Sequence, residues 1–202
     1  MFRAVNNRCA VDFAELKLPI PATQAIEILE NRGFQLFNPD IITAARSLIG
    51  KSIYKLGAKQ FQAPNLFDCS SFTKWIYGQC GIWLPRRTIQ QIEYGQTIEP
   101  QNIKKGDLVF TTGKNHNWFR TNPNQNVGHV GIATDNNSVI HAANSRAGVI
   151  ESSLECFLKT EKYRSIQRII TQPAVTLFFH TPPEREVETS DDFFWIIVQT
   201  LK

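Results

Sequence analysis

The residue types most capable of chemistry in this 202-residue sequence are a cysteine at a helix start and two histidines beside a turn. Cys69 follows Asp68, a residue type that often caps helices, and Phe72, Trp75 and Ile76 then recur at helical spacing. The first turn of a helix offers free backbone N–H groups and the positive end of the helix dipole, and both lower the pKa of a thiol. The pattern makes Cys69 a candidate nucleophile, and a buried structural thiol, the commoner role of a single cysteine, is the alternative.

A nucleophilic cysteine needs a base, and His129 and His141 are the candidates. They lie in two predicted strands, 128–133 and 139–143, which a three-residue turn at 135–137 joins. In this register both histidines fall on one face as diagonal neighbours, so one imidazole can take the thiol proton while the other fixes its tautomer. Two partly exposed strand histidines are the alternative interpretation. The same register aligns the apolar residues of the other face, Val130 with Ala142 and Ile132 with Ile140.

The elements that must position these residues are helices in the first half of the chain and strands in the second. The predicted helices are one around Ala25 to Leu29, one from Pro39 to Ile49, one from Cys69, and a short one whose Thr88 and Gln91 form a capping box. The predicted strands are 107–110, the two histidine strands, and edge strands at 149–150 and 164–170. Helices followed by strands predict an α+β fold.

The composition divides the chain into a central domain with two extensions. Pro182-Pro183 and the acidic residues after them predict a linker, and Phe193–Val198 predicts a strand or helix that packs on the domain. The predicted segments are an N-terminal segment with a short helix (1–38), a catalytic domain (39–171) and a C-terminal extension (172–202).

The charge and the cysteines exclude several classes of protein. The formal net charge of +4 is spread along the sequence, so we expect an anionic polymer to be tolerated but no nucleic-acid partner. No apolar run is long enough to span a membrane. Asp12 and Glu15 interrupt any secretion signal, so we expect a cytoplasmic protein, a removed signal, or export by a signal-independent route.

We expect no metal site, because neither His116 nor any cysteine pair has ligand spacing. The cysteines expected to act as small hydrophobic residues are Cys9, Cys80 and Cys156.

Taken in order, the motifs resemble the NlpC/P60 family of cysteine peptidases over roughly residues 41–170. The residues that carry the resemblance are Asp68-Cys69-Ser70-Ser71-Phe72, Gly81-Ile82, Leu84-Pro85-Arg86, Gln91, Gly95, Gly106-Asp107-Leu108-Val109-Phe110, Gly128-His129-Val130-Gly131-Ile132 and Ile140-His141-Ala142. Each motif alone has low specificity, but their order and combination are strongly specific. The resemblance implies a papain-like fold, in which a small antiparallel sheet packs against helices and the nucleophile stands at a helix N-terminus.

The resemblance also implies roles for individual residues. The implied triad is Cys69 as nucleophile, His129 as base and His141 as the orienting third member. Tyr54 matches a tyrosine that helps to position the thiol or contributes to the oxyanion site. Asp68 and Ser70 match positions that contact the free amino end of the substrate in some members. The implied partners are peptidoglycan stem peptides or muropeptides, often cleaved between γ-D-glutamate and a diamino acid, and no cofactor is implied.

The sequence departs from the family's usual motifs near the predicted site, and these departures bear on substrate specificity. Arg86 and Arg87 are candidates for bidentate binding of a substrate carboxylate, and a solvated basic pair is the alternative. The loop at 111–127, with Trp118, Phe119 and Arg120, is a candidate lid over the site, or packs its aromatic residues on the core. The departures are Ser71 for a glycine, Ala58 for the second glycine after the tyrosine, Ile53 for a proline, and Arg87 for a small hydroxyl residue.

Three functions follow from these residues. The first is a cysteine hydrolase that acts on peptidoglycan-type peptides through an acyl-enzyme. The second keeps the same residues but acts as an amidase or acyltransferase on another acyl substrate. The third is a peptide-binding module without turnover. A thiol of low pKa at Cys69 is expected for the enzymes and is not needed by a binding module.

Overall fold

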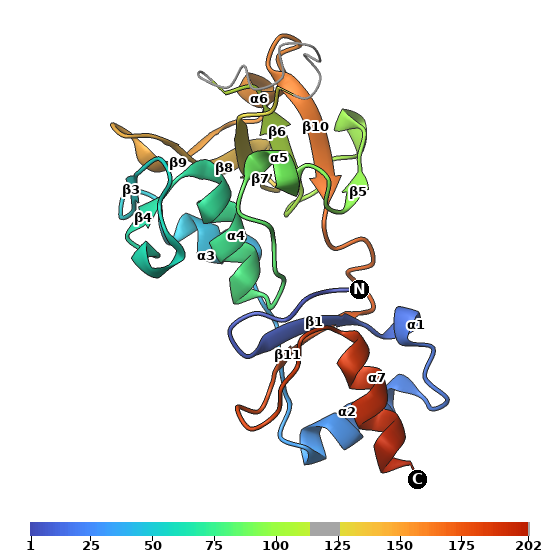
Figure 1. The fold of residues 1–202 in the computed structure, drawn as a ribbon. Coiled ribbons are helices and arrows are strands. Elements are labelled where there is room, and N and C mark those ends of the chain that lie inside the picture. The colour runs from blue at the N-terminus through green and yellow to red at the C-terminus, as the bar shows by residue number, and fades with distance from the viewer. Residues whose placement is uncertain (114–125, 202) are drawn as a thin grey trace. The chain divides into compact units, whose positions relative to one another are not determined.

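A computed structural model describes residues 1–113 and 126–201 (Figure 1). Most of the predicted loop, including His116, Trp118, Phe119 and Arg120, lies outside the described residues. The chain forms two compact units, which are described separately. Unit 1 comprises residues 1–40, 77–83 and 172–202, and unit 2 comprises residues 41–76 and 84–171.

Unit 2 is built on a six-stranded antiparallel sheet with the order β5-β10-β6-β7-β8-β9. Its strands are β5 (Gln96–Thr97), β6 (Leu108–Thr111), β7 (His129–Ala133), β8 (Ser138–Asn144), β9 (Gly148–Ser153) and β10 (Tyr163–Arg168). The predicted edge strand at 149–150 is confirmed as β9. The strand predicted at 164–170 is confirmed as β10, but its predicted place at the edge is wrong, because the two-residue strand β5 pairs outside it. So short a strand leaves no periodicity to read in the sequence.

The β7–β8 hairpin has the predicted register. Ile132 pairs with Ile140 and Ala133 with Val139 across the turn at 135–137. Asn137 adopts a positive φ of 55°, a conformation that asparagine tolerates well. One face of the hairpin therefore carries His129, Gly131 and His141 together.

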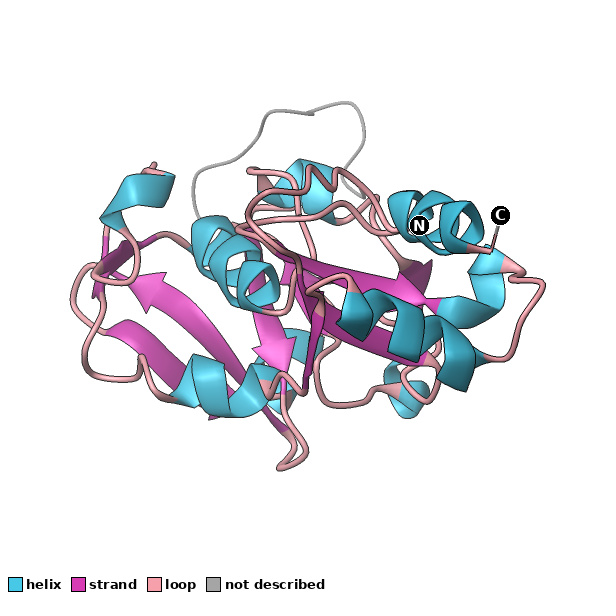
Figure 2. Cartoon of the chain, turned by 90° about the horizontal axis from the view of Figure 1, so that it is seen from below, coloured by secondary structure: helices cyan, strands magenta, loops and turns pink. Residues whose placement is uncertain are grey.

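The helices of unit 2 precede or flank this sheet, which confirms the predicted α+β class (Figure 2, helices cyan and strands magenta). The short helix α6 (Glu155–Leu158) contacts β6 and β9. The helix predicted from Pro39 to Ile49 is shorter, since regular helical structure ends at Arg46 and turns lead on to Gly50. The remaining elements are α3 (Ile41–Arg46), η1 (Gln60–Gln62), α4 (Cys69–Gln79, of which the last three residues belong to unit 1), α5 (Thr88–Gln91), η2 (Pro100–Asn102), α6 (Glu155–Leu158), and the parallel pair β3 (Ile53–Tyr54) and β4 (Leu66–Phe67).

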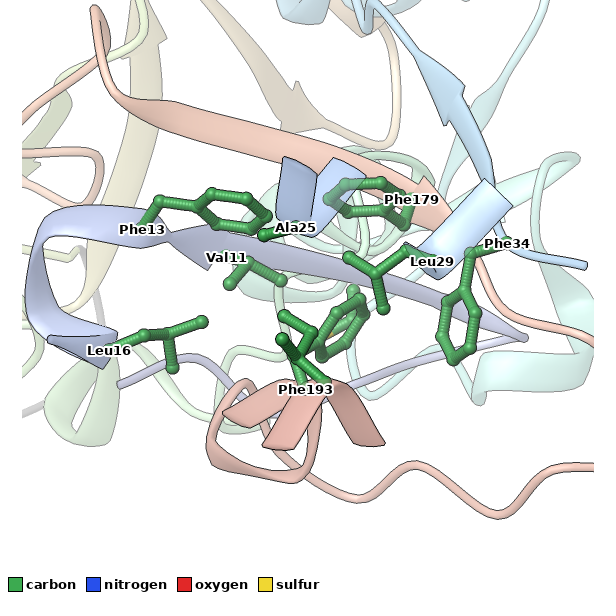
Figure 3. Close-up of a cluster of buried hydrophobic side chains, with 10 residues drawn as sticks. Val11, Phe13, Leu16, Ala25, Leu29, Phe34, Phe179 and Phe193 are labelled. Atoms are coloured by element: carbon green, nitrogen blue, oxygen red, sulfur yellow. The ribbon is translucent and has the colours of Figure 1, made fainter. Parts of the chain in front are cut away.

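Unit 1 joins the two ends of the chain in one small fold. The N-terminal strand β1 (Arg8–Asp12) pairs with β11 (Thr176–His180), which also pairs with β2 (Gln35–Phe37). The remaining elements are α1 (Phe13–Leu16), α2 (Ala22–Asn31) and α7 (Asp191–Thr200). The apolar stretch from Phe193 is a helix, and Phe193 packs with Phe34 and Phe179 in a buried aromatic cluster (Figure 3).

The charges of the chain are unevenly divided between the two units. Of the 22 lysines and arginines, 16 fall within the residue ranges of unit 2, together with 8 of the 18 aspartates and glutamates. The ranges of unit 2 thus carry a formal net charge of +8, and those of unit 1 carry −4. The basic ranges suit an anionic partner.

Among the described residues, no helix combines the length and apolar character needed to cross a bilayer.

Candidate active site

The N-terminus of α4 places Cys69 in the first turn of a capped helix. Asp68 Oδ1 accepts a hydrogen bond from the Ser71 backbone N–H at 2.8 Å, and Ser71 Oγ accepts one from the Asp68 backbone N–H at 2.9 Å. This reciprocal pair is a capping box. Ser71, one of the departures from the family motif, thus supplies the second half of the helix cap.

Arg86 holds the carboxylate of Asp68. Its guanidinium donates to Asp68 Oδ1 at 3.0 Å and to Oδ2 at 2.5 Å, and also to Ser70 Oγ and the Ala58 carbonyl. Burial alone would raise the pKa of Asp68, but the hydrogen bonds from Arg86 and Ser71 outweigh it and lower the pKa. Because both terminal nitrogens of Arg86 have protein partners, the side chain is placed to hold Asp68 and not to clamp a substrate carboxylate bidentately.

Cys69 is nearly buried, with 6% of its surface exposed. Its Sγ lies 3.9 Å from the carbonyl oxygen of Gly128, the residue before His129. Burial, with a smaller contribution from Asp68, raises the pKa of Cys69 to about 11, although hydrogen bonds from the Val130 and Ser70 backbone and from Thr88 oppose this rise. The prediction of a lowered thiol pKa is wrong, because desolvation outweighs the helix N-terminus.

The two histidines form a buried pair. His129 Nε2 lies 2.8 Å from His141 Nδ1, and the rings meet edge to face at 81°. Phe157 on α6 packs against both rings. Burial lowers the pKa of His129 to about 4; burial and the neighbouring His129 lower the pKa of His141 to about 3. Both imidazoles are therefore neutral at pH 7, which is the state that a base requires.

Gly131 has no side chain, and this leaves room for the side chains of Val139 and His141. A Cβ at Gly131 would lie 2.4 Å from Val139 Cγ1 and 3.0 Å from His141 Cβ. Only glycine fits opposite His141 without a shift of these side chains.

A cavity of about 650 Å³ opens over Cys69. Tyr54 lines it with the other predicted site residues, and burial, Cys69 and Asp68 raise the pKa of its phenol, which keeps it protonated as a donor. The lining residues used below are Tyr54, Lys59, Asp68, Cys69, Ser70, Arg86, Arg87 and Thr88. The structure thus brings six predicted residues to one cavity and pairs the other two, His129 and His141, on the neighbouring hairpin. The six are Tyr54, Asp68, Cys69, Ser70, Arg86 and Arg87.

Sequence reasoning missed three polar side chains around the site. Thr88 hydrogen-bonds Cys69, and Ser152 Oγ lies 3.0 Å from His141 Nε2. Gln91, fully buried, donates to the Ser70 and Pro85 carbonyls at 2.9 Å. Gln91 could have been found from the sequence, because it is one of the residues that carry the family resemblance. The predicted capping box of Thr88 and Gln91 is wrong, because Gln91 points inward and Arg87 is the N-cap.

The other cysteines lie apart from this chemistry. Cys9 and Cys80 are buried, as predicted for small hydrophobic residues, and burial raises the pKa of each to about 12. Cys156 is exposed, so the prediction is wrong there, because it lies on the outer side of a one-turn helix whose neighbour Phe157 faces the core. Within residues 1–113 and 126–201, no group of three or more His, Cys, Asp or Glu is arranged to hold a metal ion.

Comparison with known proteins adds an independent line of argument. A model of the NlpC/P60 family matches residues 50–168. The chain is 30% identical over 134 residues to the peptidoglycan DL-endopeptidase CwlO of Bacillus licheniformis, covering 64% of this chain and 27% of that protein. It is 32% identical over 120 residues to the murein DD-endopeptidase MepS/murein LD-carboxypeptidase of Escherichia coli, covering 59% and 56%.

The fold is also similar to a solved structure. An NlpC/P60 family protein from Bacillus cereus superposes with a TM-score of 0.54 and 25% identity, over 64% of this chain and 39% of that one. The chain spans less than two thirds of the length of each of these three proteins.

Proposed function

Since the chain belongs to the NlpC/P60 family, we propose that it is a cysteine endopeptidase that hydrolyses peptide bonds in the stem peptides of peptidoglycan. The observation that carries the proposal is the position of Cys69, which begins α4, lines the cavity and lies against the backbone on either side of His129. The curated relatives named as peptidoglycan and murein endopeptidases support the substrate class.

Catalysis begins from a neutral pair, the Cys69 thiol and the His129 imidazole, because burial raises one pKa to about 11 and lowers the other to about 4. The thiol proton passes to His129 as Sγ bonds to the substrate carbonyl carbon. His141 accepts a hydrogen bond from the Nε2–H of the resulting imidazolium and so orients it. Backbone N–H groups at the start of α4 and the Tyr54 hydroxyl stabilise the oxyanion.

The acyl-enzyme then forms and is hydrolysed. The peptide C–N bond breaks as the His129 imidazolium gives its proton to the leaving amine, which leaves a thioester on Cys69. A water molecule gives a proton to His129 and attacks the thioester carbonyl. The C–S bond breaks, Cys69 regains its proton from His129, and the product leaves as a carboxylic acid. No cofactor takes part in these steps.

The charge of the cavity suits an acidic peptide. Among the described residues, Lys59, Arg86 and Arg87 line it against one carboxylate, Asp68, which Arg86 already neutralises. Lys59 and Arg87 are both exposed, so their charges are available to a ligand. Arg86 already donates hydrogen bonds to the side chains of Asp68 and Ser70. The predicted contact of these two residues with the free amino end of a substrate stays a prediction.

We propose the bond between γ-D-glutamate and a diamino acid as the scissile bond. The resemblance to the family motif and the similarity to a relative named a DL-endopeptidase support this choice. Another relative is named a DD-endopeptidase and LD-carboxypeptidase, so the products of those two cuts are the alternatives that the test must distinguish.

The test is mass spectrometry of purified soluble muropeptides incubated with this protein and with Cys69→Ala. We expect fragments from the native protein only, with masses that place the cut after γ-D-glutamate. Fragments cut elsewhere would refute the proposed bond but keep the hydrolase. Equal fragments from both proteins, or none from either, would refute the cysteine endopeptidase.

The alternatives give different outcomes in the same assay. An amidase or acyltransferase gives no peptide fragments but forms a Cys69-dependent product with another acyl donor, whereas a binding module retains muropeptides without any product. Slow alkylation of Cys69 does not separate them, because the buried thiol has a raised pKa under all three functions.

A further inference from the structure

Ser152 lies at the end of a line of hydrogen bonds that begins at His129. His129 Nε2 and His141 Nδ1 are 2.8 Å apart, and His141 Nε2 and Ser152 Oγ are 3.0 Å apart. The strand register explains the second contact, because His141 pairs with Ile150 and Ser152 is the next residue of β9 on the same face. Three strands, β7, β8 and β9, thus contribute one side chain each.

The direction of these hydrogen bonds follows from where the protons must be. Once His129 has taken the thiol proton, both of its ring nitrogens carry hydrogen, so its Nε2–H must donate to His141 Nδ1. His141 then carries its own proton on Nε2 and donates to Ser152 Oγ. The opposite direction would place a proton on the remaining nitrogen of neutral His129 and leave no lone pair for the thiol proton.

We propose that Ser152 is a positioning residue for the reaction. By accepting from His141 Nε2–H, it holds the tautomer in which His141 Nδ1 accepts from His129. This inference rests on the proposed function, because it takes His129 as the base of Cys69.

The charges around the two histidines show why the acceptor Ser152 Oγ is important. Burial lowers the pKa of His129, and burial and the neighbouring His129 lower the pKa of His141; among the described residues, no carboxylate contributes to either shift. The carboxylate nearest in sequence, Glu151, alternates to the other face of β9, where it binds Arg46 and Ser138. His141 and Ser152 are thus neutral hydrogen-bond partners in line behind the imidazolium of His129, and Ser152 is the last of them.

The test compares three variants of Ser152 in the full chain. Ser152→Ala removes the acceptor, and we expect kcat on muropeptides to fall about tenfold with KM within about twofold, as for the loss of one hydrogen bond between neutral groups. Ser152→Thr keeps the hydroxyl and restores kcat. Ser152→Asp supplies a charge, so the acid limb of the pH profile of kcat moves to higher pH. Ser153→Ala, an exposed neighbour on the same strand, is the matched control and leaves kcat unchanged.

A second readout does not depend on turnover. Nitrogen-15 NMR of the imidazoles, recorded without substrate, should show neutral His141 protonated at Nε2 in the native protein and in Ser152→Thr, a mixture of tautomers in Ser152→Ala, and a higher pKa of His129 in Ser152→Asp. His141 protonated at Nδ1 in the native protein, or tautomers and kcat unaffected by Ser152→Ala, would overturn the inference. If muropeptides are not cleaved, the proposed function fails, and the tautomer result still shows whether Ser152 sets the tautomer of His141.

Discussion

Gly131→Ala adds one methyl group at the most confined point of the β7–β8 hairpin. The new Cβ would lie 2.4 Å from Val139 Cγ1, whereas ordinary contact begins at 3.4 Å, so the two must separate by about 1 Å. Val139 is fully buried in a packed cluster and has a stiff side chain, so it cannot yield without moving its neighbours. Overpacking of this kind costs about 1–3 kcal/mol of unfolding free energy.

The same methyl group disturbs the histidine pair. It would lie 3.0 Å from His141 Cβ, and a displacement of His141 by half an ångström or more stretches the 2.8 Å contact with His129 beyond hydrogen-bond length. We expect kcat to fall more than about tenfold, measured at a temperature where the variant is still folded. Thermal unfolding followed by circular dichroism should show a Tm lower by about 2–4 °C per kcal/mol lost.

Gly78→Ala is the matched control for this prediction. Gly78 lies within α4, and a Cβ there would meet only Val5 Cγ1, at 3.4 Å. The same change should leave unfolding free energy unchanged or raise it by up to about 1 kcal/mol, because alanine is the better helix former. A Gly131→Ala variant as stable and as active as Gly78→Ala would refute the steric reasoning.

Three further predictions concern charge. Arg86→Met removes the cation beside Asp68 and should lower unfolding free energy by about 2–3 kcal/mol in urea denaturation, less than for a fully buried pair because Arg86 is partly exposed. The pKa values of His129 and His141, about 4 and about 3, lie below the unfolded value of about 6.5, so below that pH the unfolded chain binds more protons. Stability should therefore be complete above pH 6.5 and fall toward pH 4, and His141→Asn should flatten this fall. Arg87→Ser should raise KM for acidic stem peptides about three- to tenfold and leave KM for amidated ones unchanged, with kcat as the control.

The hairpin was predictable because its signal is local. Alternating apolar residues and the turn at 135–137 determine the register, and the register places His129 and His141 on one face. Cys69 was predictable in position, since Asp68 and the apolar residues after it define a capped helix. Both predictions depend on residues within one element or one turn.

The properties that depend on distant packing were not predictable. The thiol pKa is raised by burial, which no neighbour of Cys69 in the sequence reports. The pairing of β1 with β11 joins residues about 170 positions apart. The two ends of the chain were therefore predicted as separate extensions. Arg86 donates hydrogen bonds to Asp68 and to the Ala58 carbonyl, and only the fold brings these segments next to it.

The proposed mechanism requires Cys69 to form a covalent acyl-enzyme with the stem peptide. The most direct test is to quench the reaction of the native protein with muropeptide in acid and measure the intact protein mass within the first turnover. We expect a transient mass increase equal to the acyl fragment, mapped to Cys69 by peptide analysis and absent in Cys69→Ala. Peptide fragments released with no adduct at any time, and equally by Cys69→Ala, would contradict it.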